Sequence, residues 1–197
     1  TLATVRTIKT ILGIEHKVKL QPRAPEATPT HVFKAITRAN HQLGLMLDTP
    51  CVAANVHDEL QLCIQHLVRV CHVRGIEASI PDVTLVHQVT PYQVQTALLR
   101  ASQRLAKVMQ SYGHEALAFE VRSTKVTTSS LRDLSEIATG LVSDLEFLQL
   151  KEVRGVKPRR LHYPGWVFPS HLNQAAIQLE LLLERIEASF DAPKDRR

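Results

Sequence analysis

The fold is decided by the stretch 75–94, which reads GIEASIPDVTLVHQVTPYQV. It repeats the plan of a stretch 62 residues earlier, because Gly13-Ile14-Glu15 also leads through a proline-bearing linker to Thr28-Pro29-x-x-Val32. Four further identities continue at the same offset, where Ala35, Arg38, Ala39 and Leu43 match Ala97, Arg100, Ala101 and Leu105. The match covers a helix end, a linker and a helix start, so we expect a repeated architectural unit.

Apolar residues recur at the spacing of a helix with one buried face in five long segments. These segments lie within residues 32–46, 56–71, 94–108, 131–148 and 172–186. A shorter stripe predicts one more helix at the start of the chain, on Leu2, Val5, Ile8 and Leu12. We therefore predict an all-α helical bundle of five long helices plus a short N-terminal helix.

The residues at the predicted helix ends agree with these stripes. Thr28 and Thr90 can cap a helix start, and a proline follows each of them at the first helical position, where its missing N–H costs nothing. The run 128–130 offers the same capping chemistry without proline. Glycines that can close a helix in the left-handed conformation follow four of the stripes, at Gly13, Gly75, Gly113 and Gly155.

The linkers between these helices are long. Pro91 lies 16 positions after Gly75, whereas helix pairs in bundles join through about 2–8 residues. Stretched at ~3.3 Å per residue, such a linker spans roughly 45–50 Å, more than the roughly 32 Å length of a 21-residue helix. We expect extended crossover linkers that start each helix parallel to the one before. Asp48-Thr49-Pro50 is the exception, since so short a junction predicts an antiparallel hairpin.

The apolar residues within the linker stretches 80–86 and 117–121 predict extended chain packed along grooves between helices, with short strands as the alternative. No polar Gly/Ser stretch divides the chain, so we predict a single helical domain over 1–197. Its internal repeat would be 13–48 and 75–110. Two further linker-helix units would cover 113–154 and 155–190, and 191–197 would be a tail.

Composition excludes some classes of protein. An apolar content of 44% and a charged content of 22% are typical of a soluble globular domain, and charges interrupt the richest apolar run, so no membrane-spanning helix is expected. The net charge of +5 would permit nucleic-acid binding, but the basic residues are scattered and form short runs only at 157–160 and 194–197. We regard a nucleic-acid partner as unlikely.

The sequence assigns no compartment and no oligomeric state. The chain begins at Thr1 rather than Met, which is compatible with a removed leader and export as well as with a trimmed chain. Three cysteines, Cys51, Cys63 and Cys71, cannot form a closed disulfide framework.

Few residues point to catalysis or to a metal. Cys63 and His66 are spaced to share a metal ion, but Cys63 lies in an apolar stripe, where a free cysteine behaves as a small hydrophobe, so core packing is favoured. The nucleotide-binding, nucleophile-elbow, haem-attachment and zinc-protease motifs do not occur, and no cofactor is predicted. Carboxylates at 58–59, 144 and 146 lie on helix faces expected to be polar, which predicts a solvated role.

The segment 159–169 is the densest cluster of aromatic and basic residues. Its candidate binding residues are Arg159, Arg160, Tyr163, Trp166 and Phe168. Aromatic and arginine side chains concentrate binding free energy when they are partly exposed. The alternative is that Trp166 and Phe168 anchor the last linker against the bundle.

The sequence favours a non-catalytic helical binding or scaffold module whose grooves contact a protein partner or a small ligand. A helical metal- or cofactor-binding protein or enzyme is the first alternative, and a basic nucleic-acid-binding protein is the second.

Overall fold

The computed structural model describes residue 26 and residues 28–46, 52–119, 130–153, 158–162 and 165–191, without the side chains of 41–46 and 191. Within these residues the chain is helical and contains no strand, which confirms the predicted fold class. The helices are α2 (Pro29–Met46), α3 (Ala53–Arg74), α4 (Pro91–Ser111), α5 (Leu131–Leu148) and α6 (Pro169–Asp191), and a π-helical turn, η1 (Gln149–Val153), extends α5. The helix predicted on residues 2–12 lies outside the described residues.

Side chains at the helix starts take the capping roles that the sequence predicts. The hydroxyl of Thr90 accepts the N–H of Gln93, whose side-chain oxygen in turn accepts the N–H of Thr90 at 2.8 Å. Ser130 and Asp133 form the same reciprocal pair at the start of α5. The Thr28 hydroxyl accepts the N–H of the residue three positions on, at 3.3 Å. These bonds satisfy backbone donors that a helix start leaves without an intrahelical partner.

Glycine closes α3 at the predicted position. Gly75 has a φ of 69°, in the left-handed region that a side chain would disfavour. Its N–H donates to the carbonyl of His72, and the N–H of Ile76 donates to the carbonyl of Cys71. These two backbone hydrogen bonds end the helix, and the linker begins after them.

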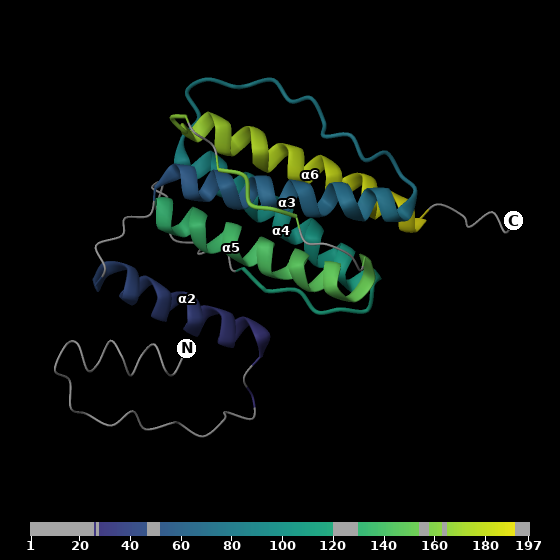
Figure 1. The fold of residues 1–197 in the computed structure, drawn as a ribbon, viewed down its shortest axis with the longest axis horizontal. Coiled ribbons are helices and arrows are strands. Elements are labelled where there is room, and N and C mark those ends of the chain that lie inside the picture. Colours follow the sequence, from purple (N-terminus) through teal and green to yellow (C-terminus); the bar gives the residue numbers. More distant parts are fainter. Residues whose placement is uncertain are drawn as a thin grey trace, which may run out of the picture.

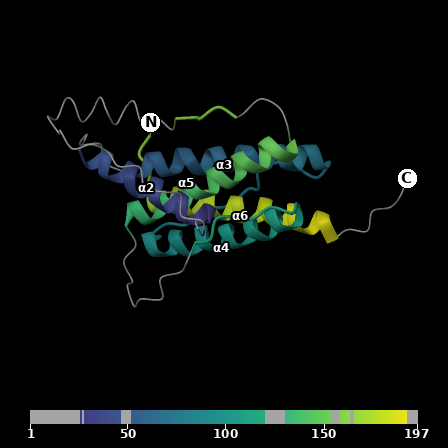
Figure 2. The ribbon, with the colours of Figure 1, turned by 90° about the horizontal axis from the view of Figure 1, so that it is seen from below.

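Helices α3 to α6 run side by side in the same direction (Figures 1 and 2). Both α3 and α4 pack against α5 and α6, which places α3 and α4 on opposite corners of the bundle. Side-chain pairs between neighbouring helices keep a nearly constant sequence separation, as parallel helices require. It is 80 residues for Arg100 with Glu180, 83 for Arg104 with Glu187, and 80 for Glu59 with Thr139.

The described linker segments, 76–90 and 112–119, lie along helices and run back toward the end where the previous helix began. Residues 79, 81 and 83 each offer a backbone carbonyl to α6, where the donors are Arg185, Gln178 and Gln174 respectively. Residues 114–119 follow α5 in the same antiparallel sense, from a His114–Glu152 pair to a Leu117–Asp144 hydrogen bond. Neither described linker segment, 76–90 or 112–119, contains a strand.

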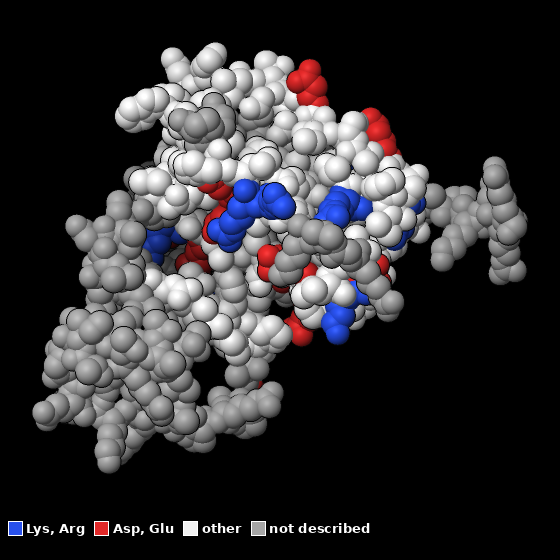
Figure 3. Space-filling model, viewed as in Figure 1, with Lys and Arg blue, Asp and Glu red and all other residues white. Residues whose placement is uncertain are grey.

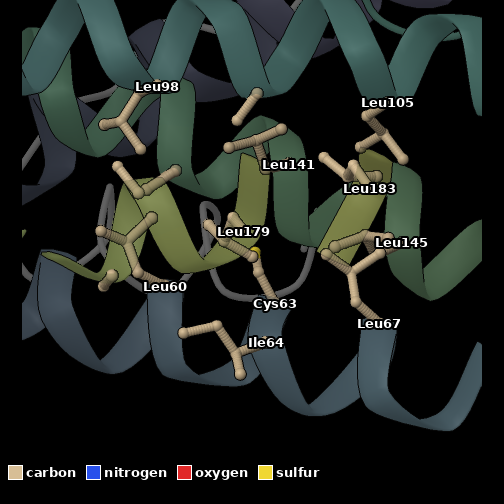
Figure 4. Packing of buried hydrophobic residues seen from close by; sticks show 14 of the residues in the cluster. Leu60, Cys63, Ile64, Leu67, Leu98, Leu105, Leu141, Leu145, Leu179 and Leu183 are labelled. Atoms are coloured by element: carbon tan, nitrogen blue, oxygen red, sulfur yellow. The ribbon is translucent and has the colours of Figure 1, made fainter. Parts of the chain in front are cut away.

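Leucine side chains from all four parallel helices fill the core, and Figure 4 shows Leu145 of α5 beside Leu67 of α3 and Leu183 of α6. Cys63 lies among them and is fully buried. Burial raises the pKa of the Cys63 thiol well above its ordinary value, because the thiolate would lose its hydration. The structure therefore confirms the apolar packing predicted for Cys63, and Cys71 is buried in the same core. Cys51 lies outside the described residues.

Helix α2 departs from the sequence prediction. It lies beside the bundle and runs opposite to α3 (Figure 1). The stripe that periodicity assigns to a buried face is exposed in its described part, with Val32 at 49% and Ile36 at 55% of their full accessibility. The prediction that this face is buried is wrong for residues 32–39, because α2 rests on the linker 114–119 through its other side.

Candidate functional site

Four of the five residues predicted to form a binding patch are described. Arg159 and Arg160 are exposed, Phe168 is 56% exposed and Trp166 is 87% exposed. Tyr163 lies outside the described residues. A side chain as exposed as Trp166 does not anchor a linker, so the anchoring alternative is wrong for this residue. The neighbouring Val167 packs against the core instead.

The start of α6 sets the position of the Phe168 ring. The backbone N–H of Phe168 donates to Nδ1 of His171 at 3.1 Å, and the N–H of His171 donates to the carbonyl of Phe168 at 3.0 Å. The two rings lie 5.8 Å apart between centroids. Because this reciprocal capping fixes the backbone at the helix start, the phenylalanine ring is held in a defined position outside the core.

A hollow of about 470 Å³ opens beside Phe168. It lies between the start of α6 and the end of the linker that precedes α4, two segments about eighty residues apart in the sequence. Its lining is apolar with a few polar side chains: Leu85, His87, Gln88, Val89, Phe168, Pro169, Ser170 and His171. We call Trp166, Phe168 and this hollow the Trp166 surface.

Gln88 shapes the linker wall of the hollow. Its φ of 61° lies in the left-handed region, which is uncommon for a residue other than glycine. The Gln174 side chain fixes the chain a few residues earlier, by donating to the carbonyl of Val83. The linker wall is therefore held against α6, and the hollow is formed in the folded chain without a bound partner.

Arg159 and Arg160 precede this surface in the chain, on the described segment 158–162. Within the described residues, no hydrogen bond or ring contact joins Arg159 or Arg160 to Trp166, so the predicted patch is not one contact cluster. The same stretch is held to the bundle by His162, whose Nδ1 donates to the Asp58 carboxylate at 2.8 Å. Two positive charges therefore lie a few residues before Trp166, on a segment fixed to the start of α3.

The carboxylates that the sequence analysis assigns to solvated faces are partly buried, which corrects that prediction. Asp144 is 7% exposed, and its carboxylate accepts the backbone N–H of Leu117 at 3.0 Å. Both oxygens of Glu59 lie 3.0 Å from the hydroxyl of Thr139, which donates to them. Burial raises the pKa of each carboxyl, and that of Asp144 reaches about 6.

His66 is a second buried polar residue whose role the sequence does not reveal. It is 1% exposed, and its Nδ1 is hydrogen-bonded to the side-chain oxygen of Gln149, the first residue of η1. The pair joins α3 to the π-helical turn. Helical periodicity could place His66 near the stripe, but its partner comes from a segment 83 residues away.

Replacing Asp144 with asparagine is expected to stabilise the fold at neutral pH. Because the pKa is raised in the folded chain, the contribution of this group to stability is greatest below about pH 4. It falls as pH rises from there through about 6, since the folded chain must then bury a carboxylate. The amide oxygen of an asparagine could still accept the Leu117 N–H. We expect a gain of about 1–2 kcal/mol at pH 7.5, since burial of the new NH₂ group offsets part of the relief.

Urea unfolding followed by circular dichroism measures this effect at pH 7.5 and pH 4.5. The difference between wild type and Asp144→Asn should shrink at the lower pH, where the wild-type carboxyl is protonated. An equal difference at both pH values, or a loss at pH 7.5, would show that the ionised carboxylate is not penalised in the folded chain.

The residues of the Trp166 surface are suited to non-covalent binding. They offer aromatic and aliphatic area, two imidazoles and a hydroxyl, and the two described cysteine thiols are remote from them in the core. Within the described part of the chain, no group of three or more His, Cys, Asp or Glu side chains is arranged to hold a metal ion. In that same part, no helix combines the length and the apolar character needed to cross a membrane.

Comparison with family models, with curated proteins and with solved structures found no match to this chain.

Proposed function

We propose that the protein is a non-catalytic helical binding module that holds an extended segment of a protein partner across the Trp166 surface. The observation that carries this proposal is the exposure of Trp166 and of Phe168, the latter of which lines the hollow. Large aromatic rings left in water on a folded protein are typical of surfaces that become covered on association. An apolar side chain of the partner would fill the hollow, with Arg159 and Arg160 available to its acidic residues.

A protein segment suits this surface better than a small ligand. The hollow is open, so it could cover only part of a small molecule, whereas ligand pockets bury most of a ligand's surface. An extended peptide can place one side chain in the hollow and run on past the exposed ring of Trp166. The exposed imidazole of His87 on the rim would then hydrogen-bond to the peptide backbone.

Nucleic acid is a weaker alternative because the basic residues of α4 are already paired. Arg100, Arg104 and Lys107 form ion pairs with glutamates of α6, at 3.0–3.7 Å. Figure 3 shows basic and acidic side chains interspersed over the face it presents, rather than a continuous basic tract. Phosphate backbones are bound by unpaired positive charge, which this arrangement does not gather.

The proposal is tested by selecting peptides from a displayed library of short random sequences against the full chain. Peptides that engage the Trp166 surface should bind Trp166→Ala at least about tenfold more weakly, the scale of a binding hot spot. Phe147→Ala is the matched control, because Phe147 is an exposed aromatic residue at the end of α5, at the opposite end of the bundle. It should leave binding unchanged.

The Trp166→Ala variant should remain folded, with a free energy of unfolding within about 0.5 kcal/mol of wild type, because the ring is mostly in water. Binding that is equally tight for wild type and Trp166→Ala across all selected peptides would overturn the proposal. So would a Trp166→Ala variant that fails to fold, since the ring would then belong to the core.

We also propose that residues 13–48 and 75–110 are copies of one linker-helix unit, in which an extended crossover linker leads from a helix end to the next helix. The sequence identities at the 62-residue offset support this. The helix starts lend further support, because Thr28 with His31 and Thr90 with Gln93 make the same reciprocal capping contacts at α2 and α4. Most of the first copy's linker lies outside the described residues.

A further inference from the structure

Helix α2 presents an exposed apolar face. Val32 and Ile36 are about half exposed, and the small side chains of Ala35 and Ala39 are exposed between and beside them. We call these four residues the α2 face. Small residues among branched ones leave a shallow apolar strip along a helix, a shape into which the ridge of another helix can pack.

The opposite side of α2 attaches it to the rest of the molecule. The ring of Phe33 meets the ring of Phe119 edge-on, with centroids 6.1 Å apart, and the hydroxyl of Thr30 accepts the N–H of Ala118 at 3.1 Å. This side is thus occupied by the linker 114–119. The α2 face points away from these contacts and has no described helix packed on it.

The equivalent face of α4 shows what kind of element fits. At the 62-residue offset, Val94, Ala97, Leu98 and Ala101 replace the four residues of the α2 face, and each is at most 1% exposed. Helix α4 packs on α6 and α5. Arg100, which corresponds to Arg38 of α2, pairs with Glu180 of α6 at 3.2 Å.

The charges on α2 favour one of the molecules that could bind the α2 face over the others. Helix α2 carries Lys34 and Arg38 and contains no aspartate or glutamate. A second copy that used its own α2 would bring like charges together, and its α6 is already packed in its own bundle. A helix that resembles α6 would instead bring glutamates to Arg38, as α6 brings Glu180 to Arg100.

We propose that the α2 face is a second interaction surface, which binds an amphipathic helix of a partner protein whose apolar stripe is flanked by glutamates. The partner helix lies parallel to α2 in the register that α6 adopts on α4. This surface shares no residue with the Trp166 surface, so the two proposals stand or fall separately.

The test uses a synthetic peptide with the sequence of residues 169–191 as the partner helix, titrated into the full chain. Ile36→Glu should weaken its binding at least about tenfold, because a buried charge would meet the apolar stripe. Val73→Glu is the matched control, since it introduces the same charge at another exposed apolar residue, on α3. It should leave binding unchanged, and both variants should unfold at the wild-type urea concentration.

A charge swap tests the register. Arg38→Glu should weaken the peptide about three- to tenfold, and a peptide carrying Glu180→Arg should recover that loss on the Arg38→Glu protein. Failure of the peptide to bind, or equal binding to wild type and Ile36→Glu, would overturn the proposal. A wild-type dimer that Ile36→Glu converts to a monomer would assign the face to a second copy. Peptide binding only after removal of residues 1–12 would assign the α2 face to the chain's own amino end. Both this result and the dimer result would contradict the proposal of a partner helix.

Discussion

Replacing Arg74 with alanine is expected to lower the free energy of unfolding by about 2–3 kcal/mol, which is large for one partly exposed residue. Arg74 ends α3 and joins three helices. Its guanidinium donates to the hydroxyl of Ser189 at 2.8 Å, to the Ser189 carbonyl and to the hydroxyl of Tyr112. It also lies over the ring of Phe190, with its central carbon 3.7 Å from the ring centroid.

The size of the Arg74 effect follows from the several interactions that one truncation removes together. Charge-assisted hydrogen bonds contribute more than neutral ones, and truncation leaves the acceptors on α6 partly buried and unpaired. Arg74→Lys should recover little of the stability, because an ammonium group cannot form the planar fork or stack on the ring in the same way. Urea unfolding followed by circular dichroism measures both variants.

Arg132→Ala is the control for Arg74, because Arg132 is exposed in the first turn of α5 and its loss should change stability by less than about 0.5 kcal/mol. A loss of similar size for both arginines would contradict the idea that Arg74 ties the carboxyl ends of α3, α4 and α6 together.

Replacing Gly140 with alanine should destabilise the protein, although alanine is the better helix former by about 1 kcal/mol. Gly140 lies within α5, and a Cβ there would overlap the ring of Phe119. That ring covers α5 and in turn supports Phe33 of α2. We expect a net loss of about 1–3 kcal/mol, as for overpacking of a close-packed site.

A double-mutant cycle makes this prediction specific. In a Phe119→Ala background the clash is gone, so Gly140→Ala should become stabilising by up to about 1 kcal/mol, the gain in helix propensity. The sign reversal corresponds to a coupling of about 1–4 kcal/mol between the two sites. If Gly140→Ala has the same effect in both backgrounds, the Phe119 ring does not pack over Gly140 in solution.

The helices could be predicted from the sequence because local physics determines them. Leu60, Ile64 and Leu67 recur at helical spacing, and a glycine stands where α3 needs a left-handed residue. Capping at Thr90 and Ser130 is likewise a contact between residues three positions apart. These signals require no knowledge of distant parts of the chain.

The buried polar pairs could not be predicted, because their partners come from distant segments. Asp144 is buried only because the linker residue Leu117 covers it and donates a hydrogen bond, and a single sequence does not reveal that match. The pairing of His66 with Gln149 depends in addition on η1, a departure from regular helix geometry that periodicity does not report. Periodicity therefore placed these polar groups in solvent or at the edge of a stripe.

The difference between α2 and α4 shows what hydrophobic periodicity cannot predict. Nearly the same apolar stripe is exposed on α2 and buried on α4. A stripe indicates which face of a helix is apolar, but what covers that face depends on the rest of the assembly. In the candidate site, composition likewise identified Trp166 and Phe168, whereas the hollow beside them depends on the return of the linker that ends at Val89.

The most direct test of the central claim is quenching of Trp166 fluorescence by acrylamide in the folded full chain, because Trp166 is the only tryptophan. With the ring 87% exposed, we expect emission and quenching close to those of the urea-unfolded chain, and protection from quencher when a selected peptide binds. A blue-shifted emission that resists quenching in the free folded protein would place the ring in the core and contradict the account.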